Sequence, residues 1–323
     1  MERRYLAMIH SHTDYDNLLK IINRSYRVSV NQMSLYRDMI GRVYFSQGVE
    51  ERYVLKIYRP FHTDNALNSI RVLDYLGAND YPVVSIVPTT AGEPSITIET
   101  PEGQCTGILY DYVLGTEPVL EIEIARIGLQ VGRLHDLMEK YPHRLPERGK
   151  PFYIDRYISA LKAKEYPPGR IDELEGYGKD LWKRMERLPR GFCHGDLHSG
   201  NMLKTESGEY VLFDFDVASR AYPVIDVATL SDCTDFNDFN SVDYDRTMRR
   251  FTEFYGGYNQ VSTISDDEID TIVDFIAIRH YEIISTIVSC QGLQGLSKGF
   301  MDEQYEWLLQ WKHACEKKRG STI

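Results

Sequence analysis

The stretch from about 191 to 218 constrains the fold of this chain more than any other. It carries two compact polar clusters, a His-Gly-Asp turn ending at Asp196 with Asn201 close behind, and an Asp-Phe-Asp run from Asp214 to Asp216. Apolar residues flank both clusters, a pattern typical of short strands joined by tight loops. We therefore expect Asp196 and Asn201 to share one loop, and a following strand pair to bring Asp214 back beside them.

The chemistry of these side chains points to phosphoryl transfer. That reaction needs a carboxylate to orient and deprotonate an acceptor hydroxyl, and oxygen ligands for the magnesium bound to the nucleotide phosphates. Asp196 is the candidate base, and Asn201 and Asp214 are the candidate magnesium ligands. Either fragment alone is more typical of a polar turn or a strand end than of a site, but their joint order and spacing favour a site.

The N-terminal part of the chain has the pattern of a sheet with one main helix. Residues 42–46 and 52–58 predict two strands of an antiparallel hairpin, because the residues between them form a turn pattern. A helix is predicted over 64–76. Further strands are predicted over 83–88, 95–99 and 106–112.

Helical periodicity dominates after Gly115. Apolar residues recur at spacings of three and four over 124–138, which predicts an amphipathic helix facing a core. Ser265 and Glu268 have the spacing of a capping box, so a helix is predicted to start there and continue through Ile276. The change of pattern places a boundary near Leu114 and Gly115.

Composition restricts the partners of the chain. Its 323 residues include 48 acidic and 37 basic side chains, a net charge of −11 that disfavours nucleic acid and anionic membranes. Met1 to Tyr5 lead into polar residues, and no stretch approaches the ~20 apolar residues of a spanning helix. The five cysteines lack the spacing of a zinc knuckle or a disulfide framework. We expect a cytoplasmic protein whose partners include neither nucleic acid nor a membrane.

The two polar clusters resemble motifs of a known superfamily. His-Gly-Asp-Leu-His-x-Gly-Asn from His194 to Asn201 and Phe-Asp-Phe-Asp from Phe213 to Asp216 resemble the catalytic loop and metal-binding strand of aminoglycoside phosphotransferases, choline kinases and bacterial homoserine or methylthioribose kinases. The resemblance implies an α+β, bilobal protein-kinase-like fold. It implies a nucleotide-binding N-lobe with an antiparallel sheet over 1–114, and a mostly helical catalytic and substrate-binding C-lobe over 115–323.

The resemblance also implies roles for single residues in the C-lobe motifs. Asp196 matches the catalytic base, and Asn201 and Asp214 match the metal ligands. Asp216 is either an assisting metal ligand or a carboxylate bonded to backbone, and Asp226 matches the aspartate that steadies the catalytic loop. The implied cofactors are ATP, with GTP as an alternative, and Mg²⁺.

In the N-lobe, Lys56 matches the lysine that holds the α- and β-phosphates. The segment from Tyr110 to Val113 resembles the hinge, which implies that backbone groups of Asp111 and Val113 pair with adenine. The phosphate-covering turn is expected near Gly41, although a single glycine is a weak signal.

The helix after Lys56 departs from the family pattern. The family places a glutamate there that pairs with the lysine, but no glutamate lies between Glu51 and Glu93, and Ser69 or Arg71 stands at that position. This departure keeps open a nucleotide-binding pseudokinase. The candidate replacements are Asp64, Asn65, Asn68 and Asp74.

The segment from Ala221 to Asp245 contains six aspartates and no lysine or arginine. Carboxylates near aromatic residues suit a cationic small-molecule alcohol, while a solvated acidic loop explains them equally well. The leading function is an ATP-dependent small-molecule O-phosphotransferase of the aminoglycoside, choline or amino-alcohol, or homoserine type. A bacterial Ser/Thr protein kinase of the same superfamily and a silent binding module remain as alternatives, and the sequence leaves the oligomeric state open.

Overall fold

A computed structural model describes residues 12–320, so the opening residues Met1 to Tyr5 lie outside the described part. The chain forms two compact units. The first takes the chain up to Thr116 and again over Leu203–Asp216, and the second takes Glu117–Met202 and the chain from Val217 onward. The first contains an antiparallel sheet and the second is mostly helical, which confirms the predicted α+β class.

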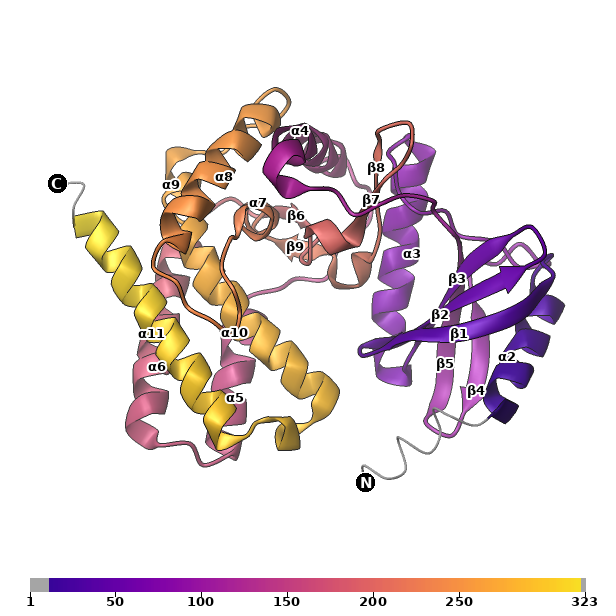
Figure 1. The fold of residues 1–323 in the computed structure, drawn as a ribbon, viewed down its shortest axis with the longest axis horizontal. Coiled ribbons are helices and arrows are strands. Elements are labelled where there is room, and N and C mark those ends of the chain that lie inside the picture. Colours follow the sequence, from indigo (N-terminus) through magenta and orange to yellow (C-terminus); the bar gives the residue numbers. More distant parts are fainter. Residues whose placement is uncertain (1–11, 321–323) are drawn as a thin grey trace. The chain divides into compact units, whose positions relative to one another are not determined.

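A five-stranded antiparallel sheet with strand order β1-β2-β3-β5-β4 forms the centre of the first unit. Figure 1 shows helix α2 on one side of this sheet and helix α3 on the other. On the α2 side, Ile22 and Tyr26 pack in one buried cluster with Tyr44, Leu55 and Leu109 of the sheet. The elements are α2 (His12–Ser25), β1 (Val30–Asp38), β2 (Gly41–Gly48), β3 (Arg52–Tyr58), α3 (Thr63–Ala78), β4 (Ile96–Thr100), β5 (Gly103–Asp111), β7 (Met202–Lys204) and β8 (Tyr210–Leu212).

The pleat of β3 sorts its side chains between the two faces of the sheet. Leu55 and Ile57 belong to the buried cluster on the α2 side. Because side chains alternate along a strand, Lys56 and Tyr58 point together to the opposite face. Lys56 lies in register with Val43 of β2 and Ile108 of β5.

Most of the predicted elements of the first unit are confirmed, with ends that differ by a few residues. The predicted strand over 83–88 is wrong, because this segment makes only two isolated bridges, Val83 with Leu212 and Ile86 with Tyr110. Prolines at both edges of the segment lack the N–H groups that a ladder needs. Helix α2 and strand β1 were not predicted as separate elements.

The β7–β8 pair belongs to the first unit, so a single boundary at Leu114 and Gly115 does not describe the chain. The Lys204 N–H donates to the Thr116 carbonyl at 2.8 Å, and the Leu212 N–H donates to the Pro82 carbonyl at 3.0 Å. These backbone hydrogen bonds join segments that lie far apart in sequence, which a boundary drawn from periodicity cannot detect.

The second unit is built from helices around two paired short strands. Figure 1 shows α10 and α11 beside α5 and α6. No helix among residues 12–320 is long and apolar enough to cross a membrane. The elements are α4 (Leu120–Met138), α5 (Arg156–Ala163), α6 (Pro168–Met185), β6 (Gly191–Cys193), β9 (Ser219–Ala221), α7 (Val224–Ser231), α8 (Asp243–Tyr258), α9 (Asp266–Ile269), α10 (Ile272–Gln291) and α11 (Lys298–Gly320).

The predicted capping box is confirmed, but the helix that it starts is short. The Ser265 side chain accepts from the Glu268 N–H, and the Glu268 side chain accepts from the Ser265 N–H. Helix α9 ends at Ile269, and α10 begins separately at Ile272. The Thr271 hydroxyl donates to the Glu268 carbonyl at 2.7 Å, a local hydrogen bond that competes with a continuous helical ladder.

Candidate active site

In the first unit, strand β3 places Lys56 against two carboxylates. The Lys56 Nζ lies 2.7 Å from Asp214 Oδ1 and 2.6 Å from Asp216 Oδ2, and only 12% of the lysine side chain is exposed. Burial lowers the pKa of Lys56, but the two carboxylates outweigh burial and raise that pKa above its ordinary value. Lys56 is therefore a fixed cation at neutral pH.

The two carboxylates beside Lys56 differ in their surroundings. Asp216 is buried, and its Oδ1 accepts a hydrogen bond of 2.6 Å from the buried Tyr58 hydroxyl. Asp214 keeps 31% of its side chain exposed and has a φ of +64°, a left-handed conformation that is uncommon for a residue other than glycine. The more exposed Asp214 is the better candidate for a metal ligand.

In the second unit, helix α7 anchors the loop that carries Asp196. Asp226, in the first turn of α7, is fully buried and accepts from the His194 N–H at 2.7 Å and the Gly195 N–H at 2.9 Å. Its Oδ2 also lies 3.2 Å from His135 Nε2. Gly195 has a φ of +83°, which favours glycine, so the loop turns sharply just before Asp196.

Asp196 is held by two neighbours in the same unit. The Asn201 amide donates to the Asp196 carbonyl at 2.8 Å and to Asp196 Oδ2 at 3.2 Å. Arg279 of α10 donates to Asp196 Oδ1 at 2.5 Å. Burial raises the pKa of Asp196, but Arg279 and then His198 outweigh it and lower that pKa to about 2. Asp196 is thus a carboxylate at neutral pH.

Each unit contains a side-chain oxygen donor that suits a hard cation such as magnesium. Asn201 uses its amide nitrogen on Asp196, which leaves its carbonyl oxygen as a ligand, and Asp214 provides a carboxylate. No group of three His, Cys, Asp or Glu side chains among residues 12–320 could hold a metal. Magnesium commonly takes only one or two protein ligands and completes its shell with phosphates and water, so the oxygen of either residue is chemically suited to that ion.

The other predicted nucleotide-binding residues lie at strand ends of the first unit. Gly41 starts β2, where a Cβ would meet the Ile57 carbonyl oxygen at 2.9 Å, so this position requires close backbone approach. Asp111 ends β5 with its N–H donating to the Ser85 carbonyl at 3.0 Å, and Val113 follows two residues later. These positions leave their predicted roles untested.

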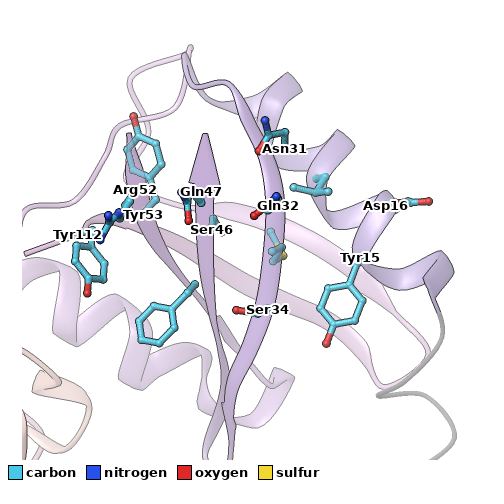
Figure 2. Close-up of a pocket in the computed structure, with 13 residues that line it drawn as sticks. Tyr15, Asp16, Asn31, Gln32, Ser34, Ser46, Gln47, Arg52, Tyr53 and Tyr112 are labelled. Atoms are coloured by element: carbon cyan, nitrogen blue, oxygen red, sulfur yellow. The ribbon is translucent and has the colours of Figure 1, made fainter. Parts of the chain in front are cut away.

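A cavity of about 490 Å³ in the first unit lies away from Lys56. Figure 2 shows its polar lining, with Tyr15 and Asp16 from α2 and Asn31 and Gln32 from β1 around it. Tyr112, which belongs to the predicted hinge segment, also lines the cavity. Lys56, Asp214 and Asp216 do not line it, so this cavity carries no part of the charged site.

The six aspartates of the acidic segment are dispersed. Asp226 anchors the loop, the buried Asp243 pairs with Arg246 at 3.0 Å, and Asp245 pairs with Lys318 at 2.7 Å. Asp235 and Asp238 are exposed. Burial raises the pKa of Asp232, against the lowering effect of Arg279 and Arg250. The Asp232 Oδ1 also accepts from the Thr234 N–H at 2.8 Å.

Sequence reasoning missed Arg279, which contacts the predicted base. It is a lone charged residue within the apolar run from Phe275 to Tyr281, and its side chain is only 15% exposed. A charge inside an apolar helix pattern needs a buried partner, so this run contained a usable signal. It also lies 3.6 Å from Glu282.

Solved structures of small-molecule kinases have the same fold as this chain. The amicoumacin kinase hAmiN in complex with AMP-PNP, Ca²⁺ and Ami is 21% identical, with 97% of this chain and 96% of that chain covered and a TM-score of 0.73. A microcompartment-associated aminopropanol kinase is 16% identical over 95% and 98%, with a TM-score of 0.74. The choline kinase LicA from Streptococcus pneumoniae is 15% identical over 95% and 100%, with a TM-score of 0.65.

A family model supplies the stronger comparison, because it matches by sequence. The model described as the phosphotransferase enzyme family matches residues 35–261, which is well over half of the chain and includes Lys56, Asp196, Asn201 and Asp214. The suspected resemblance is thereby confirmed. This protein belongs to the phosphotransferase enzyme family.

Proposed function

We propose that the protein transfers the γ-phosphoryl group of ATP to a hydroxyl group of a small molecule, with Asp196 as the base. The observation that carries this proposal is the loop from His194 to Asn201, which is anchored on the buried Asp226 and holds the Asp196 carboxylate through the side-chain N–H of Asn201. Lys56 in the first unit is the proposed ligand of the nucleotide phosphates.

The surroundings of Asp196 define its proposed part in the chemistry. Its Oδ1 accepts the short hydrogen bond from Arg279 at 2.5 Å, whereas Oδ2 accepts a longer one from Asn201 at 3.2 Å, so Oδ2 is the oxygen that we assign to the acceptor hydroxyl. The acceptor oxygen bonds to the γ-phosphorus while the bond to the β–γ bridging oxygen breaks, and ADP leaves. Because its pKa is about 2, Asp196 orients the hydroxyl and takes the proton only as the new bond forms.

The proposed metal ligands are Asp214 from the first unit and Asn201 from the second. Magnesium, when bound, neutralises charge on the phosphate oxygens. Asp214 offers a partly exposed carboxylate and Asn201 a carbonyl oxygen, both of which are hard ligands. Val113 and Asp111 are proposed to pair with the nucleobase through their backbone groups, and Gly41 to lie next to the phosphate-covering turn.

For the acceptor, we propose an alcohol that carries an amine. Aminopropanol and choline, the acceptors in the names of two similar structures, are both cationic alcohols at neutral pH. The net charge of −11 attracts such molecules. We propose Asp232, Asp235 and Asp238 for this role, because the other members of the acidic segment have different partners, Asp226 on the loop and Asp243 and Asp245 in ion pairs. The carboxylates of Asp232 and Asp235 accept from backbone N–H groups of their own loop.

The test is an ADP-release assay with ATP, Mg²⁺ and a panel of amino alcohols, neutral alcohols and sugar phosphates. Asp196→Asn should lower turnover by about two to four orders of magnitude while nucleotide affinity changes by less than about threefold. Asp172→Asn, which removes an exposed carboxylate on α6 of the same unit, is the matched control and should turn over as wild type. Wild-type turnover in Asp196→Asn would remove Asp196 from the mechanism.

A further inference from the structure

The structure shows a lysine whose usual helix partner is missing. Helix α3 carries two carboxylates, Asp64 and Asp74, and both are exposed. The side chains that α3 buries near its centre, Asn68 and Ser69, are neutral. Since a buried ammonium group needs a nearby counter-charge, the partner of Lys56 must come from another element.

Two carboxylates, Asp214 and Asp216, supply the counter-charge of Lys56, and their surroundings differ. Asp216 is 5% exposed and Asp214 is 31% exposed. Both oxygens of Asp216 are engaged, Oδ2 by the Lys56 ammonium at 2.6 Å and Oδ1 by the Tyr58 hydroxyl at 2.6 Å. An aspartate with both oxygens committed inside the first unit is poorly suited to coordinate a metal.

Tyr58 reinforces this arrangement from the same strand as Lys56. The two side chains are two residues apart on β3, so they share one face. Tyr58 is fully buried, and its hydroxyl lies 3.4 Å from the Tyr110 hydroxyl. The Lys-x-Tyr segment on β3 and the Asp-x-Asp segment after β8 therefore form one cluster of four side chains. In this cluster Tyr58 hydrogen-bonds to Asp216, and Asp216 pairs with Lys56.

We propose that Asp216 and Tyr58 are positioning residues that hold Lys56 for the nucleotide phosphates, and that Asp216 is not a metal ligand. The proposal rests on the proposed function, because it takes Lys56 as the phosphate ligand. The proposal assigns a different role to each of the two carboxylates. Asp214 serves the metal and Asp216 serves the lysine, replacing the glutamate that helix α3 lacks.

The test measures the affinity for ADP by calorimetry, once in EDTA and once in Mg²⁺. Asp216→Asn should weaken binding by roughly ten- to a hundredfold, and by the same factor in both buffers, because Lys56 acts on the phosphates without metal. Tyr58→Phe should weaken it in the same way by about three- to tenfold. Asp214→Asn should instead remove the gain that Mg²⁺ brings. Asp64→Asn, on the exposed face of α3, is the matched control and should bind as wild type.

A double-mutant cycle tests whether Asp216 affects ADP affinity through Lys56. In a Lys56→Met background, Asp216→Asn should change ADP affinity by less than about twofold, because the residue it positions is already gone. A loss confined to Mg²⁺ buffer would make Asp216 a metal ligand and overturn the proposal. An undiminished loss in the Lys56→Met background would also overturn it.

Thermal unfolding keeps the proposal separate from the proposed function. Asp216→Asn and Lys56→Met should each lower Tm, and the double variant should lose less than the sum of the two, because the pair is broken only once. Additive shifts in Tm would show that the ion pair between Asp216 and Lys56 is not formed, and would refute the proposed positioning role of Asp216. Coupled shifts in a protein that binds no ADP at all would support the pair and refute the kinase function instead.

Discussion

His280 makes the second unit sensitive to acid, and the size of the effect follows from its surroundings. The imidazole is 3% exposed and stacks on Trp307 with ring centroids 3.9 Å apart. Its Nε2 lies 2.7 Å from Gln304 Oε1, to which it donates as a neutral ring. Burial lowers the pKa of His280 to about 3, against an ordinary value of 6.5. As the pH falls, His280 is therefore protonated at a much higher pH in the unfolded chain than in the folded chain.

The sign and magnitude can be worked out from these two pKa values. The folded state keeps the ring neutral, so its contribution is complete above the unfolded pKa and is lost as the pH falls below it. Between about pH 8 and about pH 5.5, the free energy of unfolding should fall by about 1.4 kcal/mol on account of His280 alone. The loss continues toward the folded pKa of about 3.

The assay is urea unfolding followed by tryptophan fluorescence, since Trp307 stacks directly on His280. His280→Gln keeps a donor for Gln304 but does not titrate, so it should lose about 1.4 kcal/mol less than wild type over the same pH interval. All other titrating groups are common to both proteins and cancel in the comparison. Equal acid losses in the two proteins would refute the reasoning.

Three further outcomes follow from the site. Asp214→Ala should abolish the gain in ATP affinity that Mg²⁺ brings, and calorimetry showing an unchanged gain would rule out Asp214 as a ligand. Asp226→Ala leaves the buried His194 N–H and the partly buried Gly195 N–H without acceptors, so urea unfolding should show a loss of about 2–4 kcal/mol, and a stability within error of wild type would contradict the anchoring role. Asp232→Asn should reduce the ratio of kcat/KM for cationic over neutral alcohols by about three- to tenfold at low salt and by less at high salt, since salt screens the attraction. If neither the substitution nor the salt concentration changes this ratio, the acidic segment is a solvated loop with no role in acceptor binding.

Local patterns predicted those parts of the fold that are determined by neighbours in sequence. The β2–β3 hairpin is confirmed because both its strands and its turn lie in one short segment. Helix α4 is confirmed because Ile124, Ile127 and Val131 form one buried stripe. The strand predicted over 83–88 failed because apolar content was given more weight than the two flanking prolines.

Local sequence patterns did not predict the contacts between side chains of the site. The partners of Lys56 lie 158 residues away from it or further, so no periodicity reports them. The motifs identified Asp196, Asn201 and Asp214 as a set, but the role of Asp216 depends on which oxygens the register of β3 brings to it. Arg279 is 83 residues from Asp196 and was missed for the same reason.

The return of β7 and β8 to the first unit has a consequence for exchanging parts between relatives. A chimaera that transplants the second unit of another family member must carry two blocks, Glu117–Met202 and the chain from Val217, around a native Leu203–Asp216 insert. A single splice after Thr116 would pair a native Lys56 with foreign aspartates and a native Pro82 with a foreign β8. The Lys-x-Tyr and Asp-x-Asp segments must therefore be inherited together, although Glu117–Met202 of the second unit lies between them in the sequence.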